Sequence, residues 1–289
     1  MHKDFDRYRQ ILFLCYNWFI TFDWEEVMEE FFGFGGYERP AEGFLSWQHL
    51  LFVTCVVIMM IIWAVVLGKR NKHEPFEKKN RVLRIAAIVL DGAEIFRIII
   101  VCLRSGEIED VLWNLPLFLC SIQLISVPLA AFSKGRVKEA ALDFVSIFGM
   151  LGAILGTYCA GNNYAVYPVL SFDNVFSAIT HTVAGFAALY IMISGMASMK
   201  RRNIWITVVI FLGFCIAAYW ANVLIGGNYM FLVRGDGTPY DIVYNWVSGN
   251  KVLYPLLVTV LTLSYLALFY VCYFGIRKLI TSKKQPQRV

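Results

Sequence analysis

Apolar runs of about twenty residues recur along this chain, and their length constrains the fold more than any motif does. An α-helix rises about 1.5 Å per residue, so about twenty residues cross a hydrocarbon core of about 30 Å. Only 16% of the residues are charged, whereas about a quarter are charged in a soluble domain. The sequence therefore predicts an all-α, polytopic membrane protein. The expected bundle has seven transmembrane helices, over residues 44–68, 82–104, 112–132, 140–158, 174–197, 204–226 and 251–275.

The loops between these spans alternate in charge. Basic residues gather after the first, third and fifth spans and in the C-terminal tail, and the net charge of the chain is +5. The intervening loops are nearly without basic residues, and residues 227–250 contain only Arg234. Short loops rich in lysine and arginine stay on the cytoplasmic side of a membrane. We therefore expect a cytoplasmic C-terminus, an N-terminus outside, and a location in the plasma membrane.

Composition divides the chain into three parts. Residues 1–43 are expected to form an interfacial amphipathic helix and a linker, because aromatic residues are set among glutamates over residues 5–33. A re-entrant segment is the alternative for this stretch. Residues 44–275 make up the transmembrane domain, and residues 276–289 a basic cytoplasmic tail. No basic patch with interleaved aromatic residues occurs, so we expect no nucleic-acid partner, and no obligate protein partner is inferred.

Polar side chains in five of the expected spans lie at a similar depth, in the outer half of the membrane. Counting about 1.5 Å per residue from the outer end of each span places most of them roughly 10 Å deep. Charged groups inside a membrane are costly unless they are paired or hydrated, so they indicate a candidate functional site. The set comprises His49, Glu94, Arg97, Cys120, Gln123, His181 and Asn222.

Helical spacing relates several of the residues within these spans. Glu94 and Arg97 are three positions apart, which allows them to pair on one helix face. The alternative is that Arg97 extends to the outer interface. Gly149, Gly152 and Gly156 form a ridge that allows a neighbouring helix to approach closely. A purely structural role, in which polar side chains bridge helices at about 0.6 kcal/mol each, is the competing interpretation.

Four stretches of the apolar region carry a resemblance to a known family. They read LPLFLCSIQLISVPLAAF (115–132), FGMLGAILG (148–156), ITHTVAGFAALY (179–190) and GGNYMFL (226–232). The stretch WQHLLF (47–52) and the spacing of Glu94 and Arg97 also fit. In this order they resemble the YwaF family of bacterial integral membrane proteins, which is grouped with the transmembrane-protein-164-related acyltransferases. The similarity extends over roughly residues 44–275.

The resemblance implies an intramembrane acyl transfer, in which a cysteine and a histidine move a fatty acyl chain between lipids. His181 matches the histidine of the family's ITH segment. The position of the eukaryotic cysteine is Leu117 in this chain, that of the usual histidine is Phe118, and Cys120 lies one turn beyond. The implied function is a membrane lipid acyltransferase, or transacylase, with Cys120 and His181 as catalytic residues. Phospholipids or lysolipids are its partners, and no cofactor or metal is expected.

The remaining polar residues are assigned to substrate binding within this scheme. A buried thiol needs a base to become a nucleophilic thiolate. The oxyanion formed in the reaction needs hydrogen-bond donors, and an arginine suits a lipid phosphate. The expected substrate-binding residues are His49, Glu94, Arg97, Gln123, Asn222 and Asn228. The aromatic loop over residues 227–250 is expected to cover the site.

A transporter or membrane receptor is the alternative function, with a small or lipid-like ligand in the same polar pocket. Transporters place polar groups near the middle of the membrane, with access from both sides. The cytoplasmic halves of the expected spans are close to purely apolar. This asymmetry favours chemistry in the outer half over a path through the membrane.

Overall fold

The structure is a computed structural model that describes residues 24–197 and 199–282, and those residues contain helices and no strand. The interfacial helix expected over residues 5–33 lies mostly outside the described residues. The helices are α2 (Trp24–Glu30), α3 (Trp47–Asn71), α4 (Phe76–Ser105), α5 (Asp110–Trp113), α6 (Gln123–Phe132), α7 (Gly135–Tyr158), α8 (Gly161–Val166), α9 (Phe172–Ser194), α10 (Ile204–Ile225), α11 (Tyr240–Trp246) and α12 (Leu253–Ser282). Two short 3₁₀ helices cover Arg201–Asn203 and Tyr229–Phe231.

Five of the described helices are long and apolar enough to cross a membrane, which makes the chain a multi-pass membrane protein. These candidate spans are Trp47–Asn71, Gly135–Val166, Phe172–Ser194, Arg201–Ile225 and Leu253–Leu279. Helix α4 has 30 residues, but Asp91, Glu94 and Arg97 in its middle keep it out of this group. The count of seven spans and the orientation of the termini stay predictions.

The third expected span is not a continuous helix, so the prediction of one helix over residues 112–132 is wrong. Helix α5 ends at Trp113, α6 begins at Gln123, and residues 114–122 follow an irregular path between them. Pro116 lacks a backbone N–H and disfavours the helical conformation of the residue before it. The Ser121 hydroxyl accepts a hydrogen bond from the Phe118 N–H at 3.0 Å, which offers the backbone a local alternative to the helix. Cys120 therefore lies in irregular backbone.

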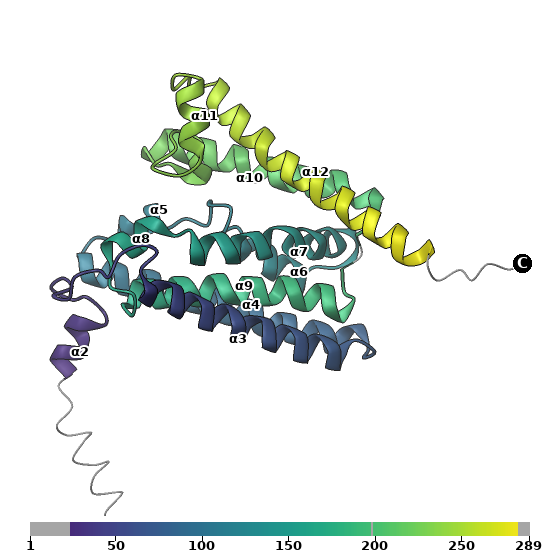
Figure 1. Cartoon of the computed structure of the whole chain (residues 1–289), viewed down its shortest axis with the longest axis horizontal. Helices are drawn as coiled ribbons and strands as arrows, with labels where there is room; N and C mark the ends of the chain where they lie inside the picture. The colour runs from purple at the N-terminus through teal and green to yellow at the C-terminus, as the bar shows by residue number, and fades with distance from the viewer. Residues whose placement is uncertain (1–23, 198, 283–289) are drawn as a thin grey trace, which may run out of the picture.

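Helix α9 is the centre of the main bundle and packs against α3, α4 and α7 (Figure 1). Small residues allow the close approach. A Cβ placed on Gly185 would lie 2.5 Å from the Met60 sulfur and 2.6 Å from the Ala153 Cβ. Helix α6 packs against α4 and α7 on the other side. The bundle thus has one shared apolar core among α4, α6, α7 and α9.

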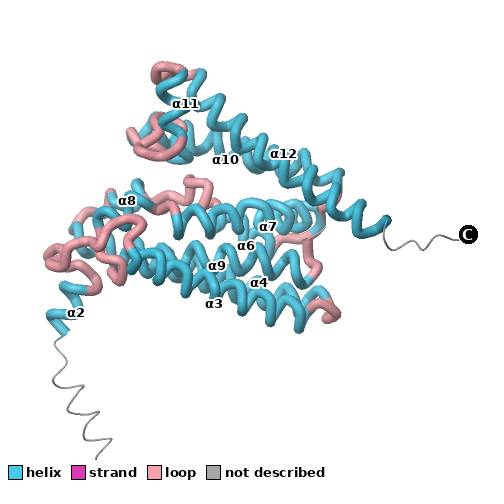
Figure 2. The backbone as a smooth tube through the Cα atoms, viewed as in Figure 1, coloured by secondary structure: helices cyan, strands magenta, loops and turns pink. Residues whose placement is uncertain are grey.

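Helices α10, α11 and α12 form a second layer over the main bundle (Figure 2). Aromatic rings join the two layers, as in the stacked pair of Phe148 on α7 and Phe211 on α10, whose centroids are 5.7 Å apart. Phe144, Tyr254 and Tyr270 are also buried in this apolar contact. The second layer is therefore attached through side-chain packing onto α7.

A cluster of polar residues connects the segment before α3 to the C-terminal end of α4 and the N-terminal end of α9. Arg104 donates to both carboxylate oxygens of Asp173, at 2.6 and 2.9 Å, and its Nη1 also donates to the Phe32 carbonyl at 3.0 Å. The Tyr37 hydroxyl donates to the same carboxylate at 2.6 Å. Burial and the Asp173 carboxylate raise the pKa of the Tyr37 hydroxyl above its ordinary value, so it stays a proton donor. This cluster is structural, and the sequence did not indicate it.

Candidate functional site

The side chains of Cys120 and His181 lie next to each other, close enough to interact, and both residues lie against glycines of α7. Cys120 comes from the irregular segment before α6, and His181 comes from the first half of α9. Both side chains are half-buried. This proximity agrees with the expectation that the two residues face one another, and their catalytic roles stay a prediction.

The contact of His181 with the backbone of Ser177 indicates which ring nitrogen carries the proton. The Nδ1 atom lies 2.6 Å from the Ser177 carbonyl oxygen, one turn earlier on α9. A carbonyl only accepts hydrogen bonds, so Nδ1 carries the proton of the neutral ring. Nε2 is then left as the acceptor for the Cys120 thiol. This arrangement gives the ring the form that a general base requires.

Cys120 and His181 pack against the glycine ridge of α7. A Cβ on Gly156 would fall onto the imidazole of His181, nearest Cδ2 and Nε2. A Cβ on Gly152 would lie 3.3 Å from the Cys120 Cα, which is closer than an ordinary van der Waals contact. The absence of side chains at these two positions therefore leaves the space in which the thiol and the ring meet.

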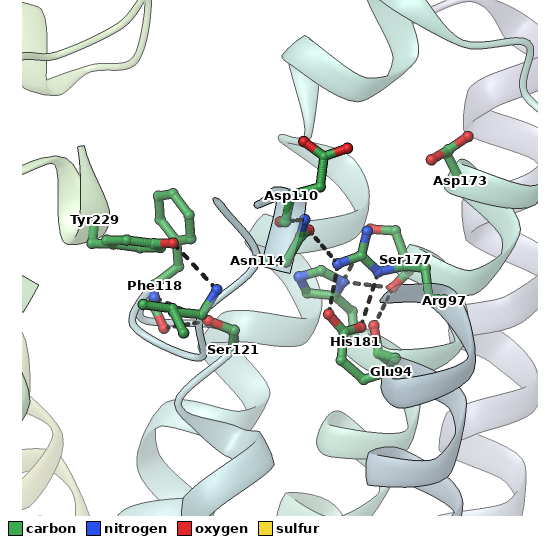
Figure 3. A network of polar contacts seen from close by, with 12 residues as sticks. Glu94, Arg97, Asp110, Asn114, Phe118, Ser121, Asp173, Ser177, His181 and Tyr229 are labelled. Atoms are coloured by element: carbon green, nitrogen blue, oxygen red, sulfur yellow. Dashed lines mark hydrogen bonds and ion pairs between the residues drawn. The ribbon is translucent and has the colours of Figure 1, made fainter. Parts of the chain in front are cut away.

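Glu94 and Arg97 of α4 form the pair that the sequence indicated, beside His181 (Figure 3). Arg97 Nε donates to Glu94 Oε2 at 3.1 Å, and Nη2 donates to Oε1 at 2.6 Å. Nη2 also donates to Asn114 Oδ1 at 2.7 Å. The two charged side chains are only 18% and 12% exposed, so extension of Arg97 to the interface is wrong. Glu94 is also close enough to interact electrostatically with His181.

Gln123 lies three residues after Cys120, and its side-chain N–H₂ group can donate a hydrogen bond. Its side chain is 1% exposed, and its Oε1 accepts from the Ser126 hydroxyl at 3.0 Å. Its Nε2 is buried with no hydrogen-bond partner among the described residues. Gln123 Oε1 would lie 3.4 Å from a Cβ on Gly149, one turn before the glycine that faces Cys120. The amide therefore lies on the same side of α7 as the thiol.

His49 is buried at the start of α3, and both its ring nitrogens are occupied by backbone groups. Its Nδ1 accepts from the Leu45 N–H at 3.1 Å, and its Nε2 lies 3.0 Å from the Thr157 carbonyl. Its ring also packs on Tyr164, with centroids 3.8 Å apart. The structure thus gives His49 a role in joining α3 to α7.

The two asparagines assigned to substrate binding both hold the loop after α10. Asn222 binds the backbone N–H of Tyr229 at 2.6 Å and its carbonyl at 3.0 Å. Asn228 is half-buried. Its Oδ1 accepts from the N–H groups of Val233 and Arg234, at 2.9 and 3.2 Å. The side-chain groups of both residues are engaged within the loop itself.

Tyr229 connects this loop to the segment that carries Cys120. Its hydroxyl donates to the Leu112 carbonyl and accepts from the Leu115 N–H at 3.2 Å. Its ring packs on Phe118 with centroids 5.0 Å apart (Figure 3). The 227–250 loop therefore packs against the segment 112–118, in agreement with the expected cover over this part of the site.

Sequence reasoning missed Asn114 as part of the polar group. Its side-chain amide donates to the Asp110 carbonyl at 2.7 Å while its oxygen accepts from Arg97. The signal was a polar residue directly before Leu115-Pro116, where the proline ends the helix and releases backbone groups.

The TMEM164 family model matches residues 44–273. This chain belongs to the TMEM164 family. The matched region contains Glu94, Arg97, Cys120, Gln123 and His181, and it leaves out α2. No curated protein and no solved structure matches the chain. Membership of the family and the apolar helices agree on a multi-pass membrane protein, and the narrower YwaF assignment stays a prediction.

Proposed function

We propose that this chain is an integral membrane acyltransferase that moves a fatty acyl chain between lipids, with Cys120 as nucleophile and His181 as general base. The observation that carries the proposal is the thiol–imidazole contact, with Nδ1 held by the Ser177 carbonyl. A nucleophile, a base and a group that orients the base are the elements of covalent acyl transfer. We place this protein in the plasma membrane, with the site in the outer leaflet.

The first half of the reaction forms a thioester. His181 Nε2 takes the proton of the Cys120 thiol, and the thiolate attacks the ester carbonyl of a donor lipid. The tetrahedral intermediate collapses as the ester C–O bond breaks, and the imidazolium returns the proton to the leaving alcohol of the lysolipid. The carboxylate of Glu94, close to His181, stabilises the imidazolium while it exists.

The second half transfers the acyl group to an acceptor. His181 removes a proton from the hydroxyl of a lysolipid, whose oxygen attacks the thioester carbonyl. The C–S bond breaks and the thiolate of Cys120 recovers the proton from the imidazolium. Both halves are ester exchange, so the cycle needs no cofactor.

Gln123 is the best candidate for stabilising the oxyanion of both intermediates. Its Nε2 is a buried donor with no hydrogen-bond partner in the part of the chain that the structure describes. Such a group costs free energy unless something accepts its hydrogen bond. An oxyanion formed beside Cys120 is an acceptor of that kind. A donor in this role contributes about 100- to 1,000-fold to the rate.

The proposal is tested by acyl exchange with purified protein in nanodiscs. The donor is phosphatidylcholine with a radiolabelled acyl chain, the acceptor is an unlabelled lysophospholipid, and labelled product is followed over time. We expect label to appear in the acceptor lipid at a rate proportional to protein. Thermal stabilisation by lipid without any exchange would instead favour the transporter or receptor function.

Arg97 gives a prediction that separates positioning from phosphate binding. We expect Arg97→Lys to lower kcat on the order of tenfold with little change in KM, because an ammonium cannot span both Glu94 oxygens and Asn114 as the planar guanidinium does. Initial rates over a range of donor concentrations measure both constants. If Arg97 binds the lipid phosphate, KM rises instead.

Arg84→Lys is the matched control for that substitution. Arg84 lies on the same helix and pairs with Glu77 at 2.8 Å, but these side chains are 41% and 72% exposed. Exposed pairs contribute about 0–1 kcal/mol, so this variant should retain wild-type kinetics. Unchanged kcat and KM in Arg97→Lys would contradict a role for the Arg97–Glu94 pair in catalysis.

A further inference from the structure

The segment that carries Cys120 has an irregular backbone over residues 114–122, between α5 and α6. A helix fixes its own backbone through regular hydrogen bonds, whereas an irregular segment depends on groups from elsewhere in the chain. On one side that group is Arg97 of α4, which donates to the Asn114 side chain at 2.7 Å. Figure 3 shows Tyr229 on the other side of the segment. The segment is therefore held between a residue of the main bundle and one of the loop after α10.

Tyr229 binds the backbone of this segment through its hydroxyl group. The hydroxyl accepts from the Leu115 N–H at 3.2 Å and donates to the Leu112 carbonyl. Its ring packs on Phe118, with centroids 5.0 Å apart, and the residue is only 2% exposed. Burial raises the pKa of the hydroxyl, so the group stays a proton donor at neutral pH. One hydroxyl thus satisfies a donor and an acceptor of the backbone, and phenylalanine at this position could satisfy neither.

Tyr229 is itself fixed by its neighbours in the loop. Asn222 of α10 accepts from its backbone N–H at 2.6 Å and donates to its carbonyl at 3.0 Å. The next two residues, Met230 and Phe231, both have a φ of 54°, a left-handed conformation that residues with a side chain rarely adopt. Such backbone persists only where the surrounding structure holds it, and it is frequent at functional sites. The Phe231 ring packs on Phe118, with centroids 5.8 Å apart, so the loop meets the irregular segment at a second point.

We propose that Tyr229 is a positioning residue that keeps the Cys120 thiol beside the His181 imidazole. It acts through the backbone groups of Leu112 and Leu115 that it binds. This role rests on the proposed function, in which Cys120 is the nucleophile and His181 its base. The loop after α10 thereby controls the reactivity of a thiol in the main bundle, and removal of one hydroxyl should be enough to reduce that reactivity.

The test compares Tyr229→Phe with the wild type in full-length protein purified in a mild detergent. The substitution removes the hydroxyl and keeps a ring to pack on Phe118. Iodoacetamide alkylates thiolates, and its rate at Cys120 is followed by mass spectrometry of the peptide that contains this residue. In the wild-type background, His181→Ala should slow this alkylation by at least about tenfold, because the base is lost. In Tyr229→Phe the same change should have an effect of less than about twofold, because the thiol no longer lies beside the ring.

The kinetics of acyl exchange give a second measurement. Tyr229→Phe should lower kcat by at least about tenfold and leave KM within about twofold, because a displaced thiol affects the reaction and not the binding of lipid. Tyr254→Phe is the matched control. Tyr254 is 1% exposed, but its hydroxyl has no hydrogen-bond partner among the described residues. This variant should keep the wild-type rate of alkylation, kcat and KM.

An unchanged His181 effect in Tyr229→Phe would overturn the positioning role, and so would an equal loss in Tyr254→Phe. No effect of His181→Ala on Cys120 in the wild-type background would contradict both the positioning role and the proposed function. Absence of acyl exchange in the wild type, with the difference in alkylation intact, would contradict the proposed function alone. Asn222→Ala frees the Tyr229 backbone and keeps its hydroxyl, and it should weaken the His181 effect in the same direction. Thermal unfolding in the same detergent verifies that each variant is folded.

Discussion

Replacement of either Cys120 or His181 by alanine is expected to abolish acyl exchange, with the activity falling by at least about 1,000-fold. The double variant should be no slower than either single variant, because a nucleophile and its base act as one unit and their effects are not additive. The physical basis is the proximity of the two side chains, which gives the thiol an acceptor for its proton in the imidazole. Initial rates of labelled-acyl transfer in nanodiscs measure all three variants against the wild type.

Cys102→Ala is the control for removal of a cysteine. Cys102 is also half-buried, but it lies on α4 outside the site, so this variant should keep full activity. Retained activity in Cys120→Ala, with loss in His181→Ala, would rule out the thioester and leave histidine as the base for direct transfer. Retained activity in both single variants would end the proposal for these two residues.

Gly156→Ala is expected to stop acyl exchange although residue 156 carries no reactive group. A methyl group there would overlap the imidazole of His181, so the ring has to move away from the α7 backbone and from the Cys120 thiol. Overpacking of this kind costs about 1–3 kcal/mol of stability. We therefore expect a loss of at least about 100-fold in kcat, because a small misplacement of a catalytic group has effects of that size.

The control for this substitution is Gly213→Ala in α10. A Cβ at Gly213 meets nothing within 4 Å, so alanine should be neutral or stabilise the helix by about 0.5–1 kcal/mol. The measurements are initial rates and thermal unfolding of both variants in the same lipid. Wild-type activity in Gly156→Ala would show that the position of the His181 ring does not matter for the reaction.

Much of the fold was predictable from the sequence, because a helix forms from interactions between residues that are close in the sequence. The runs expected over residues 174–197 and 204–226 became α9 and α10 within a few residues of their expected ends. The run over 112–132 failed because Pro116 and the Ser121 hydroxyl favour an irregular backbone there. Apolar composition indicates that a segment lies within the membrane protein, but it does not indicate whether every residue of that segment is helical.

The candidate site was predictable in part, for the same reason. The Glu94–Arg97 pair is separated by three residues, so helix geometry alone indicated it. His49 was chosen by its depth in the membrane, yet two backbone groups occupy its ring nitrogens: the N–H of nearby Leu45 and the carbonyl of Thr157, 108 positions away. The sequence shows that a polar side chain lies at a given depth and needs a hydrogen-bond partner. It does not show which other segment of the chain supplies that partner.

The sequence by itself determined that this protein is a helical membrane protein with polar groups inside its apolar segments. Hydrophobic length and charge decide that outcome, and both are properties of short stretches of chain. Only the tertiary structure decided that Cys120 and His181 meet at the glycine ridge of α7. It also decided that the buried Nε2 of Gln123 has no hydrogen-bond partner among the described residues. Cys120 and His181 are 61 positions apart in the sequence, and the contacts of His181 with Gly156 and of Cys120 with Gly152 join residues 25 and 32 positions apart. Close packing of this kind depends on every neighbour at once.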